Sequence, residues 1–434
     1  MESSDKYGVP VRQFIGGVSN YFPRPGKQHS LETAMEKRIE YVVKPTNASN
    51  EGFTGDGFVE YRIVGVPGQF LDLSELVLDI EGYLVWGDGT LVAVPDAVQL
   101  CNLGICTIIK TVSVFLNNVQ VESGINYGYT AYMRTLMDAP GWRRGSTLNL
   151  MGYTGQVMER RITDQGLALA PERNVDEFSF MAPLVLDIAT CDGYLLDNVD
   201  IRIRVELANE RFVINTKDPN RTPTYKLTKA DLKVTKLKPM DNALQSLAKQ
   251  LEKVPQTYVF DRTMYCSRPI AVGQSRVTVD NPFNKIIPSK LWFALVDMHR
   301  STGQYNYNSV YFGHENMQRV EILLDNELVY SIDYDWARGR YLQGYSQYVR
   351  AAGNAHMPLV NYTAFGQGSA IHTFSLTPEI LTDDVISIER EGQLRVNIDF
   401  SVPPPGNLLL MMYGSSQGTV TIDKARNVSL DVRQ

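Results

Sequence analysis

Cysteine and histidine are scarce in this chain of 434 residues, which contains 4 Cys and 5 His. The cysteines form no Cys-x-x-Cys pair, which argues against a zinc ribbon or a thioredoxin-like redox site. The histidines are spread along the chain without the spacing of metal ligands. We therefore predict free thiols made in a reducing compartment, and neither a metal site nor a cofactor site. The residues concerned are the four cysteines Cys101, Cys106, Cys191 and Cys266 and, among the histidines, His299, His314, His356 and His372.

Long apolar runs and an excess of basic charge are also missing. No apolar stretch reaches the about 18 residues of a membrane-spanning helix. The N-terminal MESSDKYGVPVRQF lacks the apolar core of a signal peptide. The formal net charge of −6 argues against a broad basic surface for nucleic acid. We therefore expect no membrane span, no secretion through a signal peptide and no sequence-specific nucleic acid binding.

The composition that remains is that of a folded protein with a large core. Hydrophobic residues make up 44% of the chain and charged residues 21%. The 23 tyrosines favour strands and packed interfaces. The length predicts two or three domains rather than one.

Two segments, SVFLNNVQVESG at 113–124 and EILLDNELVYSI at 321–332, have the pattern of a β-hairpin. Each places an Asn-Asn or Asp-Asn pair between two stretches in which apolar residues alternate with others. Asn and Asp tolerate the positive φ of a two-residue hairpin loop. One face of the first hairpin is then apolar. The expected cross-strand pairs are Leu116 with Val119, Val114 with Val121, Leu324 with Glu327, and Ile322 with Val329.

The surroundings of the two hairpins also match. Each hairpin is followed by aromatic residues at helical spacing, in YTAYMRTLM and in YLQGYSQYVR. Alternating strand patterns follow further on, in DIRIRVEL and QLRVNIDF, and SELVLDIEGYLV before the first hairpin resembles SKLWFALVD before the second. Four features in the same order predict an internal duplication of about 200 residues.

Many short strands between turn signals predict an all-β protein made of two tandem jelly-roll β-sandwiches, with short helices in the loops. Between the copies, MDNALQSLAKQLEKVP predicts a connecting helix with Asp241 as N-cap and a stripe of Leu244, Leu247, Ala248 and Leu251. The predicted division is an N-terminal arm at 1–57, a first jelly roll at 58–238, the connecting helix at 239–255, a second jelly roll at 256–426 and a C-terminal tail at 427–434.

At this point the chain resembles a known family. FLNNVQV, LLDNVDIRIRV, the block from FSLTPEI to VNIDF, and IDKARNV are similar to segments of the double jelly-roll major capsid (hexon) proteins of adintoviruses and Polinton-like viruses. The resemblance extends from about residue 58 to residue 430 and leaves out the N-terminal arm.

The resemblance implies a structural role without catalysis. It implies a homotrimer with a pseudo-hexagonal outline, which would tile an icosahedral virion shell around a double-stranded DNA genome. It also implies neighbouring capsomers, penton and minor capsid proteins as partners. The duplication fits this expectation, because two similar units repeated by a threefold axis give a pseudo-sixfold block.

The arm is predicted to serve assembly. Residues 1–45 carry seven Lys and Arg against five Asp and Glu, which is not the dense basic run of a genome-binding arm. Four apolar residues could anchor it to a neighbouring capsomer. We expect it to be disordered in the free trimer and ordered in the shell, and deletion of residues 1–40 to leave the trimer folded. These anchors are Phe14, Ile15, Tyr21 and Phe22.

The alternative function is a two-domain β-sandwich that binds or hydrolyses glycans. Glu327, Asp333 and Asp335 are close in sequence, and paired carboxylates are the catalytic groups of glycosidases. A polar turn after a strand explains these residues equally well, so we predict no catalytic residues. Trp142 and Trp336 lie beside arginines in predicted loops, and we interpret them as residues that pack within their loops or as assembly contacts between chains.

Overall fold

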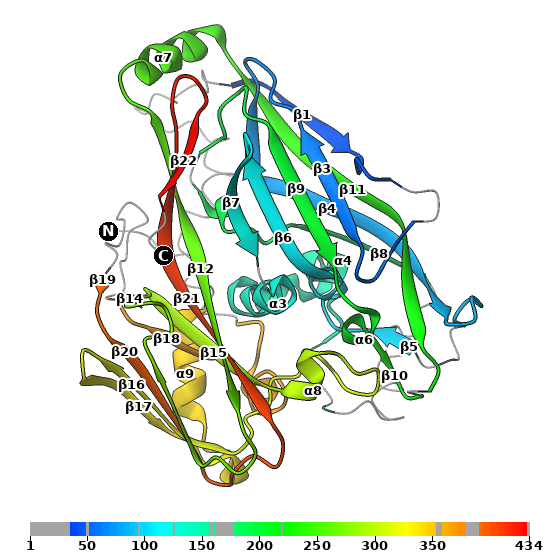
Figure 1. The fold of residues 1–434 in the computed structure, drawn as a ribbon, viewed down its shortest axis with the longest axis vertical. Helices are drawn as coiled ribbons and strands as arrows, with labels where there is room; N and C mark the ends of the chain where they lie inside the picture. The colour runs from blue at the N-terminus through cyan, green and yellow to red at the C-terminus, as the bar shows by residue number, and fades with distance from the viewer. Residues whose placement is uncertain are drawn as a thin grey trace, which may run out of the picture.

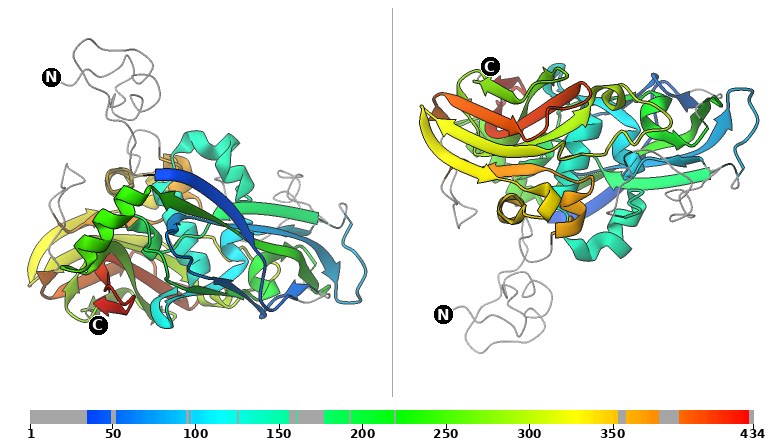
Figure 2. Two further views of the ribbon diagram at one scale, coloured as in Figure 1. Left: turned by 90° about the horizontal axis from the view of Figure 1, so that it is seen from above. Right: turned by 90° about the horizontal axis from the view of Figure 1, so that it is seen from below.

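The computed structural model describes residues 35–431 except 49–51, 94–95, 97, 125, 156–159, 161–176, 192, 219, 353–357 and 378–389. Figure 1 shows two β-units side by side, with a helix between them and another helix at one end of the molecule. The views from above and below in Figure 2 show the same two units next to each other.

The first unit contains a five-stranded and a four-stranded antiparallel sheet. The five-stranded sheet has the order β1-β11-β4-β8, with β2 (Phe53–Thr54) also paired to β11, and the four-stranded sheet has the order β3-β9-β6-β7. The strands are β1 (Met35–Val43), β3 (Phe58–Ile63), β4 (Phe70–Trp86), β6 (Ile109–Leu116), β7 (Val119–Gly124), β8 (Glu177–Pro183), β9 (Ile201–Leu207) and β11 (Pro223–Pro239).

The second unit repeats this arrangement. Its sheets have the orders β12-β21-β15-β18 and β13-β20-β16-β17. The strands are β12 (Gln256–Ile270), β13 (Arg276–Asp280), β15 (Lys290–Asp297), β16 (Met317–Leu324), β17 (Glu327–Asp333), β18 (His372–Ser375), β20 (Leu394–Phe400) and β21 (Leu408–Ile422).

Both units are jelly rolls. When the eight strands of either unit are numbered along the chain, the first pairs with the eighth, the second with the seventh, the third with the sixth and the fourth with the fifth. This is the pairing of one long hairpin. In addition, the eighth strand pairs with the third, and the seventh strand pairs with the fourth. These two extra pairs fold the long hairpin into two packed sheets. The predicted fold class and the internal duplication are confirmed.

The two hairpins 113–124 and 321–332 form the tip of each roll, as β6–β7 and β16–β17. The loop residues Asn117, Asn118, Asp325 and Asn326 all have positive φ, between 44° and 70°. The pairs Leu116–Val119 and Leu324–Glu327 next to the loops are confirmed. The next predicted pairs are wrong, because each hairpin has a β-bulge there and places Val114 opposite Glu122 and Ile322 opposite Tyr330. Val121 and Val329 are the extra residues of the two bulges.

The first loop residue fastens each tip to the seventh strand of its roll. The side-chain Oδ1 of Asn117 accepts a hydrogen bond from the backbone N–H of Asp200 at 2.8 Å. The Oδ1 of Asp325 accepts one from the N–H of Gln393, also at 2.8 Å. The backbone N–H groups of the same two loop residues donate to the carbonyl oxygens of Asp200 and Gln393, at 2.9 and 2.8 Å. This shared contact explains why Asn or Asp recurs at the position.

The predicted helices are present. The aromatic stripes form α3 (Tyr127–Asp138) and α9 (Leu342–Ala351), each after the hairpin of its roll. The connection between the rolls is α7 (Asp241–Leu251). Asp241 is its first helical residue and not its N-cap, which is Met240, so the predicted cap is wrong by one position. A carboxylate in the first turn still stabilises the positive end of the helix.

Shorter elements complete the part of the chain that the structure describes. The remaining strands are β2 (Phe53–Thr54), β5 (Val98–Leu100), β10 (Ile214–Thr216), β14 (Ile286–Ile287), β19 (Arg390–Glu391) and β22 (Val428–Asp431). The remaining helices are α2 (Gly104–Thr107), η2 (Gly141–Gly145), α4 (Thr147–Leu150), η4 (Ile188–Thr190), α6 (Glu210–Val213), α8 (Met298–Ser301), η5 (Trp336–Arg338) and α10 (Tyr362–Gly366). Across the described ranges, every helix is too short or too polar to cross a bilayer.

The predicted arm at 1–57 is wrong in its second half. β1 pairs with β11 over Met35–Val43, and β2 pairs with β11 at Leu227 and Lys226. β1 is therefore the first strand of the first roll, and the roll begins before residue 58. The sequence MEKRIEYVV hid this strand because it lies at a sheet edge with most of its side chains exposed, which removes the apolar alternation. Residues 428–431 of the predicted tail likewise form a strand, β22, which pairs with β21.

The position of β1 changes the expectation for truncation. We predict that deletion of residues 1–40 lowers the free energy of unfolding by several kcal/mol relative to deletion of residues 1–34, because it removes Met35–Glu40 and their pairing with β11. Urea denaturation of the two truncated chains measures the difference. Equal urea midpoints would show that β1 adds nothing to the stability of the first roll. They would then support an arm that extends to residue 57.

Candidate functional site: the seam between the two jelly rolls

The two rolls meet at a seam that is centred on the sheet β12-β21-β15-β18. The side chains of Leu291, Phe293 and Leu295 point into the core of the second roll. The alternate residues Trp292, Ala294 and Val296 belong to the core that includes the first roll. All six are at most 3% exposed. Burial on both faces explains why KLWFALVD is continuously apolar instead of alternating.

Helix α3 fills the space between the rolls, as Figure 1 shows. Tyr129 and Tyr132 of α3 lie against Phe312 of the second roll, with ring centroids 6.2 and 5.8 Å apart. The hydroxyl of Tyr129 donates to the carbonyl of Ser309 at 3.0 Å, and that of Tyr348 in α9 donates to the carbonyl of Leu136 at 2.6 Å. The two aromatic helices therefore fasten the rolls to each other through buried hydroxyls, and burial raises the pKa of Tyr129 and Tyr348 well above the ordinary value.

The far end of the chain adds a second attachment. The Asn117 side chain at the first hairpin tip donates to the carbonyl of Arg426 at 2.9 Å. Arg426 donates from Nε to the carbonyl of Asp197 at 2.8 Å and forms an ion pair with its carboxylate. The segment IDKARNV thus joins the second roll to the hairpin and the neighbouring loop of the first.

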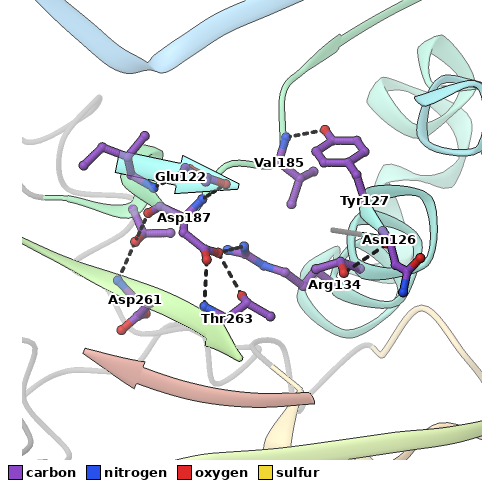
Figure 3. Close-up of polar contacts among 11 residues, drawn as sticks. Glu122, Asn126, Tyr127, Arg134, Val185, Asp187, Asp261 and Thr263 are labelled. Carbon is purple, nitrogen blue, oxygen red and sulfur yellow. Dashed lines mark hydrogen bonds and ion pairs between the residues drawn. The ribbon is translucent and has the colours of Figure 1, made fainter. Parts of the chain in front are cut away.

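A polar network crosses the seam between these attachments (Figure 3). Asp187, in the loop after β8, accepts hydrogen bonds from Arg134 of α3 at 2.8 Å and from the hydroxyl and backbone N–H of Thr263 in β12, at 2.8 and 2.7 Å. The hydroxyl of Thr190 accepts from the N–H of Asp261 at 2.8 Å. The loop and the strand come from different rolls, so these bonds set the position of one roll along the other.

Glu122 of β7 organises the same loop. Its two carboxylate oxygens accept hydrogen bonds from the backbone N–H groups of Asp187 and Ile188, at 2.9 and 3.1 Å. Burial, and then the negative charge of Asp187, raise the pKa of Glu122 to about 8. These two effects exceed the opposing effect of the N–H donors and of Arg134. A cavity of about 520 Å³ lies beside this network, lined by β7 and β12.

The sequence did not point to the network residues. Arg134 is the one charged residue in the stripe YTAYMRTLM, and Glu122 follows the apolar hairpin residues directly, so each interrupts an apolar pattern. Asp187 and Thr263 have no such signal, because they meet only when the two rolls pack.

The predicted assembly contacts have different surroundings. Trp142 is 63% exposed, and the guanidinium of Arg143 lies 5.2 Å from its ring centroid. Trp336 is partly buried in its own roll, where its ring stacks with those of His314, Tyr334 and Tyr341. Its Nε1 donates to the carbonyl of Met317 at 2.6 Å. Their role between chains stays a prediction. Phe14, Ile15, Tyr21 and Phe22 lie outside the described residues.

Among the carboxylates considered for glycan hydrolysis, Glu327 lies far from the other two, and Asp333 and Asp335 are each engaged with an arginine of the same roll. Glu327 and Asp333 stand at opposite ends of β17, six residues apart, which is about 20 Å along a strand. A glycosidase needs its two carboxyl groups within about 5–9.5 Å of each other. Asp333 pairs with Arg319 at 2.6 Å, and Asp335 caps η5 by accepting from the N–H of Arg338.

Two histidines of the second roll, His314 and His372, have packing roles. His314 stacks on the ring of Trp336 at 4.4 Å. His372 is buried, and its Nδ1 lies 2.9 Å from the hydroxyl of Tyr334. Burial lowers the pKa of His372 to about 3, so its ring is neutral at physiological pH. Within the described ranges, no three His, Cys, Asp or Glu residues gather as metal ligands would.

The comparisons with known proteins agree with this architecture. The sequence matches no protein-family model and no curated protein. The structure is similar to the Faustovirus major capsid protein, with a TM-score of 0.59 and 9% identity over 92% of this chain and 93% of that one. It is also similar to the mavirus major capsid protein, with a TM-score of 0.59 and 8% identity over 100% and 95%. A chain of the Sputnik virophage gives a TM-score of 0.62 and 11% identity over 94% and 91%.

These similarities define the fold as that of the double jelly-roll major capsid proteins, in agreement with the resemblance noted from the sequence. They extend over nearly the full length of each of the three chains, so both rolls and their arrangement are included. The narrower resemblance to adintoviruses and Polinton-like viruses stays a prediction.

We predict that Asp187→Ala lowers the free energy of unfolding by about 3 kcal/mol or more, because it leaves the largely buried Arg134 without its partner and frees Thr263. Asp333→Ala is the matched control. It removes the exposed pair with Arg319 and should cost less than about 1 kcal/mol. Denaturant unfolding of both variants tests the difference. Equal effects would mean that the seam network adds no more stability than a surface ion pair.

The raised pKa of Glu122 predicts a dependence of stability on pH. Between about pH 4.5 and pH 8 the folded chain holds the Glu122 proton and the unfolded chain does not. The contribution of Glu122 to stability is therefore complete below pH 4.5 and is lost as the pH rises to 8. The slope from this group is at most about 1.4 kcal/mol per pH unit.

Glu122→Gln, which does not titrate, should flatten this decline. Urea unfolding of the wild type and the variant at a series of pH values from 4.5 to 8 measures both slopes. The informative quantity is the slope of the unfolding free energy against pH. The amide of the variant also changes the hydrogen bonds to the loop, so the free energy of unfolding itself differs at every pH. Parallel curves would show that Glu122 is ionised in the folded chain throughout this range.

Proposed function

We propose that this chain is a major capsid protein, which acts as a structural component of a virion and not as an enzyme. The observation that carries the proposal is the fixed pairing of two jelly rolls, because a sheet buried on both faces makes one rigid block out of two similar units. A binding protein or hydrolase needs one concave site, whereas a shell needs a block with repeated, similar sides. The likeness to the capsid proteins of Faustovirus and mavirus supports the same function.

In this proposal three copies form a capsomer. Two similar units per chain and a threefold axis give six similar sides, and such a block tiles a shell with hexagonal packing. The capsomers build an icosahedral shell around a double-stranded DNA genome, with penton and minor capsid proteins completing it. Exposed apolar side chains in the described part of the chain, among them Tyr41, Val42, Leu328 and Val329, support extensive contacts between chains.

The test is the mass of the assembly. Native mass spectrometry and light scattering of the purified chain at micromolar concentration should give three chains, because an obligate interface buries about 2,000–5,000 Å². Electron microscopy should show blocks with a hexagonal outline, or particles. A stable monomer that never assembles, and that binds or cleaves glycans, would contradict the proposal and favour the alternative function.

A further inference from the structure

The cavity beside the seam network has the size and the place of a ligand pocket. Its volume is about 520 Å³. Small-molecule sites commonly measure about 300–1,000 Å³ and occur preferentially at interfaces between domains. The proposed capsid function gives this cavity no role.

The walls of the cavity come from both rolls. The first roll contributes β7, α3 and the loop after β8, and the second contributes β12, the segment 282–286 and β22. Gln120, Ser123 and Asn284 are exposed and mark the open side. The inner lining is apolar and aromatic, and each of its members is at most 9% exposed. These residues are Val121, Tyr127, Phe260, Met264, Phe283 and Ile286.

Two carboxylates, Glu122 and Asp187, meet this apolar lining. Asp187 is bonded to Arg134 and Thr263 (Figure 3). Glu122 forms no ion pair with any described residue, and each of its two oxygens accepts a single backbone N–H. A carboxylate offers about four lone-pair sites. About half of the acceptor capacity of Glu122 is therefore left for a donor in the cavity.

The charges around the network favour a positively charged ligand. Including Glu122, the carboxylates outnumber the cationic side chains by four to three, so one more positive charge balances the group. The residues concerned are Glu122 of β7, Arg134 and Asp138 of α3, Asp187 of the loop after β8, Asp261 and Arg262 of β12, and Lys290 of β15.

The lining does not suit a bare metal ion. Calcium takes about six to eight oxygen ligands. Among the described residues, no three His, Cys, Asp or Glu side chains gather as metal ligands would. The aromatic and aliphatic walls would also leave a hydrated ion without partners on most sides. An organic cation with an apolar part satisfies both portions of the cavity.

We propose that the seam cavity binds a small organic ammonium ion, with its nitrogen paired to Glu122 and its apolar part among Phe260, Phe283 and Ile286. A primary ammonium group has three N–H donors and no acceptor, which matches the acceptor capacity left on Glu122. The ligand contacts both rolls at once, so its binding stabilises their relative position. The inference goes beyond the proposed function, since the cavity lies within one chain.

Pairing with an ammonium ion favours the ionised form of Glu122. The free chain holds a proton on Glu122 below about pH 8, so binding in that range releases the proton. The dissociation constant therefore falls as the pH rises to 8, by at most about tenfold per pH unit. An alkylamine stays charged throughout, because its pKa is close to the about 10.4 of a lysine side chain.

Nuclear magnetic resonance titrations that observe the ligand test the site on the full-length chain. The probes are hexylamine, hexanol and hexanoate, which share one alkyl chain and differ in charge. At pH 8 we expect hexylamine to bind with a dissociation constant of about 1 mM or lower, and the other two about tenfold more weakly or worse. From pH 6 to pH 8 the constant for hexylamine should fall about tenfold or more, and that for hexanol should stay level.

Two variants locate the ligand. Glu122→Gln removes the charge and should weaken hexylamine about tenfold or more, abolish its pH dependence and leave hexanol unchanged. Gln120→Trp adds a bulky ring at the open side and should weaken both probes. Its matched control is Leu328→Trp, at the equivalent position of the second hairpin and outside the cavity lining. Near-ultraviolet circular dichroism and the urea midpoint show whether each variant folds.

The outcomes decide the proposal. A preference for hexylamine that Glu122→Gln removes, together with weaker binding in Gln120→Trp but not in Leu328→Trp, supports the site. Equal binding of the three probes overturns it, as does hexylamine binding that neither Glu122→Gln nor Gln120→Trp alters. The absence of saturable hexylamine binding to the wild type also overturns it. None of these results bears on the mass of the assembly, so the capsid function is tested separately.

Discussion

The sheet β12-β21-β15-β18 has no face left for water, and the rest of the molecule depends on this constraint. One face packs into the core of the second roll and the other packs into the core that includes the first roll, so separation of the rolls would expose the outer face of this sheet. Burial of Trp292 and Val296 against the first roll removes apolar surface that a lone sandwich would expose. The polar network of Glu122, Asp187 and Thr263 then selects one relative position, because hydrogen bonds are directional and apolar packing is not.

The repeated hairpin has the same structural role in both rolls and a different environment in each. At the tip of each rolled-up hairpin, Asn117 or Asp325 uses its side chain to hold the seventh strand, so the loop chemistry is retained in both copies. The positions behind the loop have diverged, with Gln120 and Val121 in one copy and Leu328 and Val329 in the other. The two hairpins thus share their loop geometry and differ behind the loop, where Val121 is buried and Val329 is exposed.

The similarity to capsid proteins at 8–11% identity shows how little of a jelly roll is specified by particular residues. The alternation of buried and exposed positions and the tight turns determine the strand pairing. The histidines illustrate the same point, since His314 and His372 serve as aromatic packing groups beside Trp336 and Tyr334. Residue types that suggest chemistry in a sequence here fill a core.

The sequence by itself determined the features that depend on neighbours along the chain. Asn-Asn and Asp-Asn loops marked both hairpin tips, the spacing of Tyr129, Tyr132 and Met133 marked α3, and the order of matching segments marked the duplication. Tertiary structure alone decided the rest. MEKRIEYVV became a strand because β11 offered it a free edge, and the bulges at Val121 and Val329 displaced the predicted pairs. Asp187 and Thr263, far apart in sequence, became partners because burial of the shared sheet brought their loop and strand together.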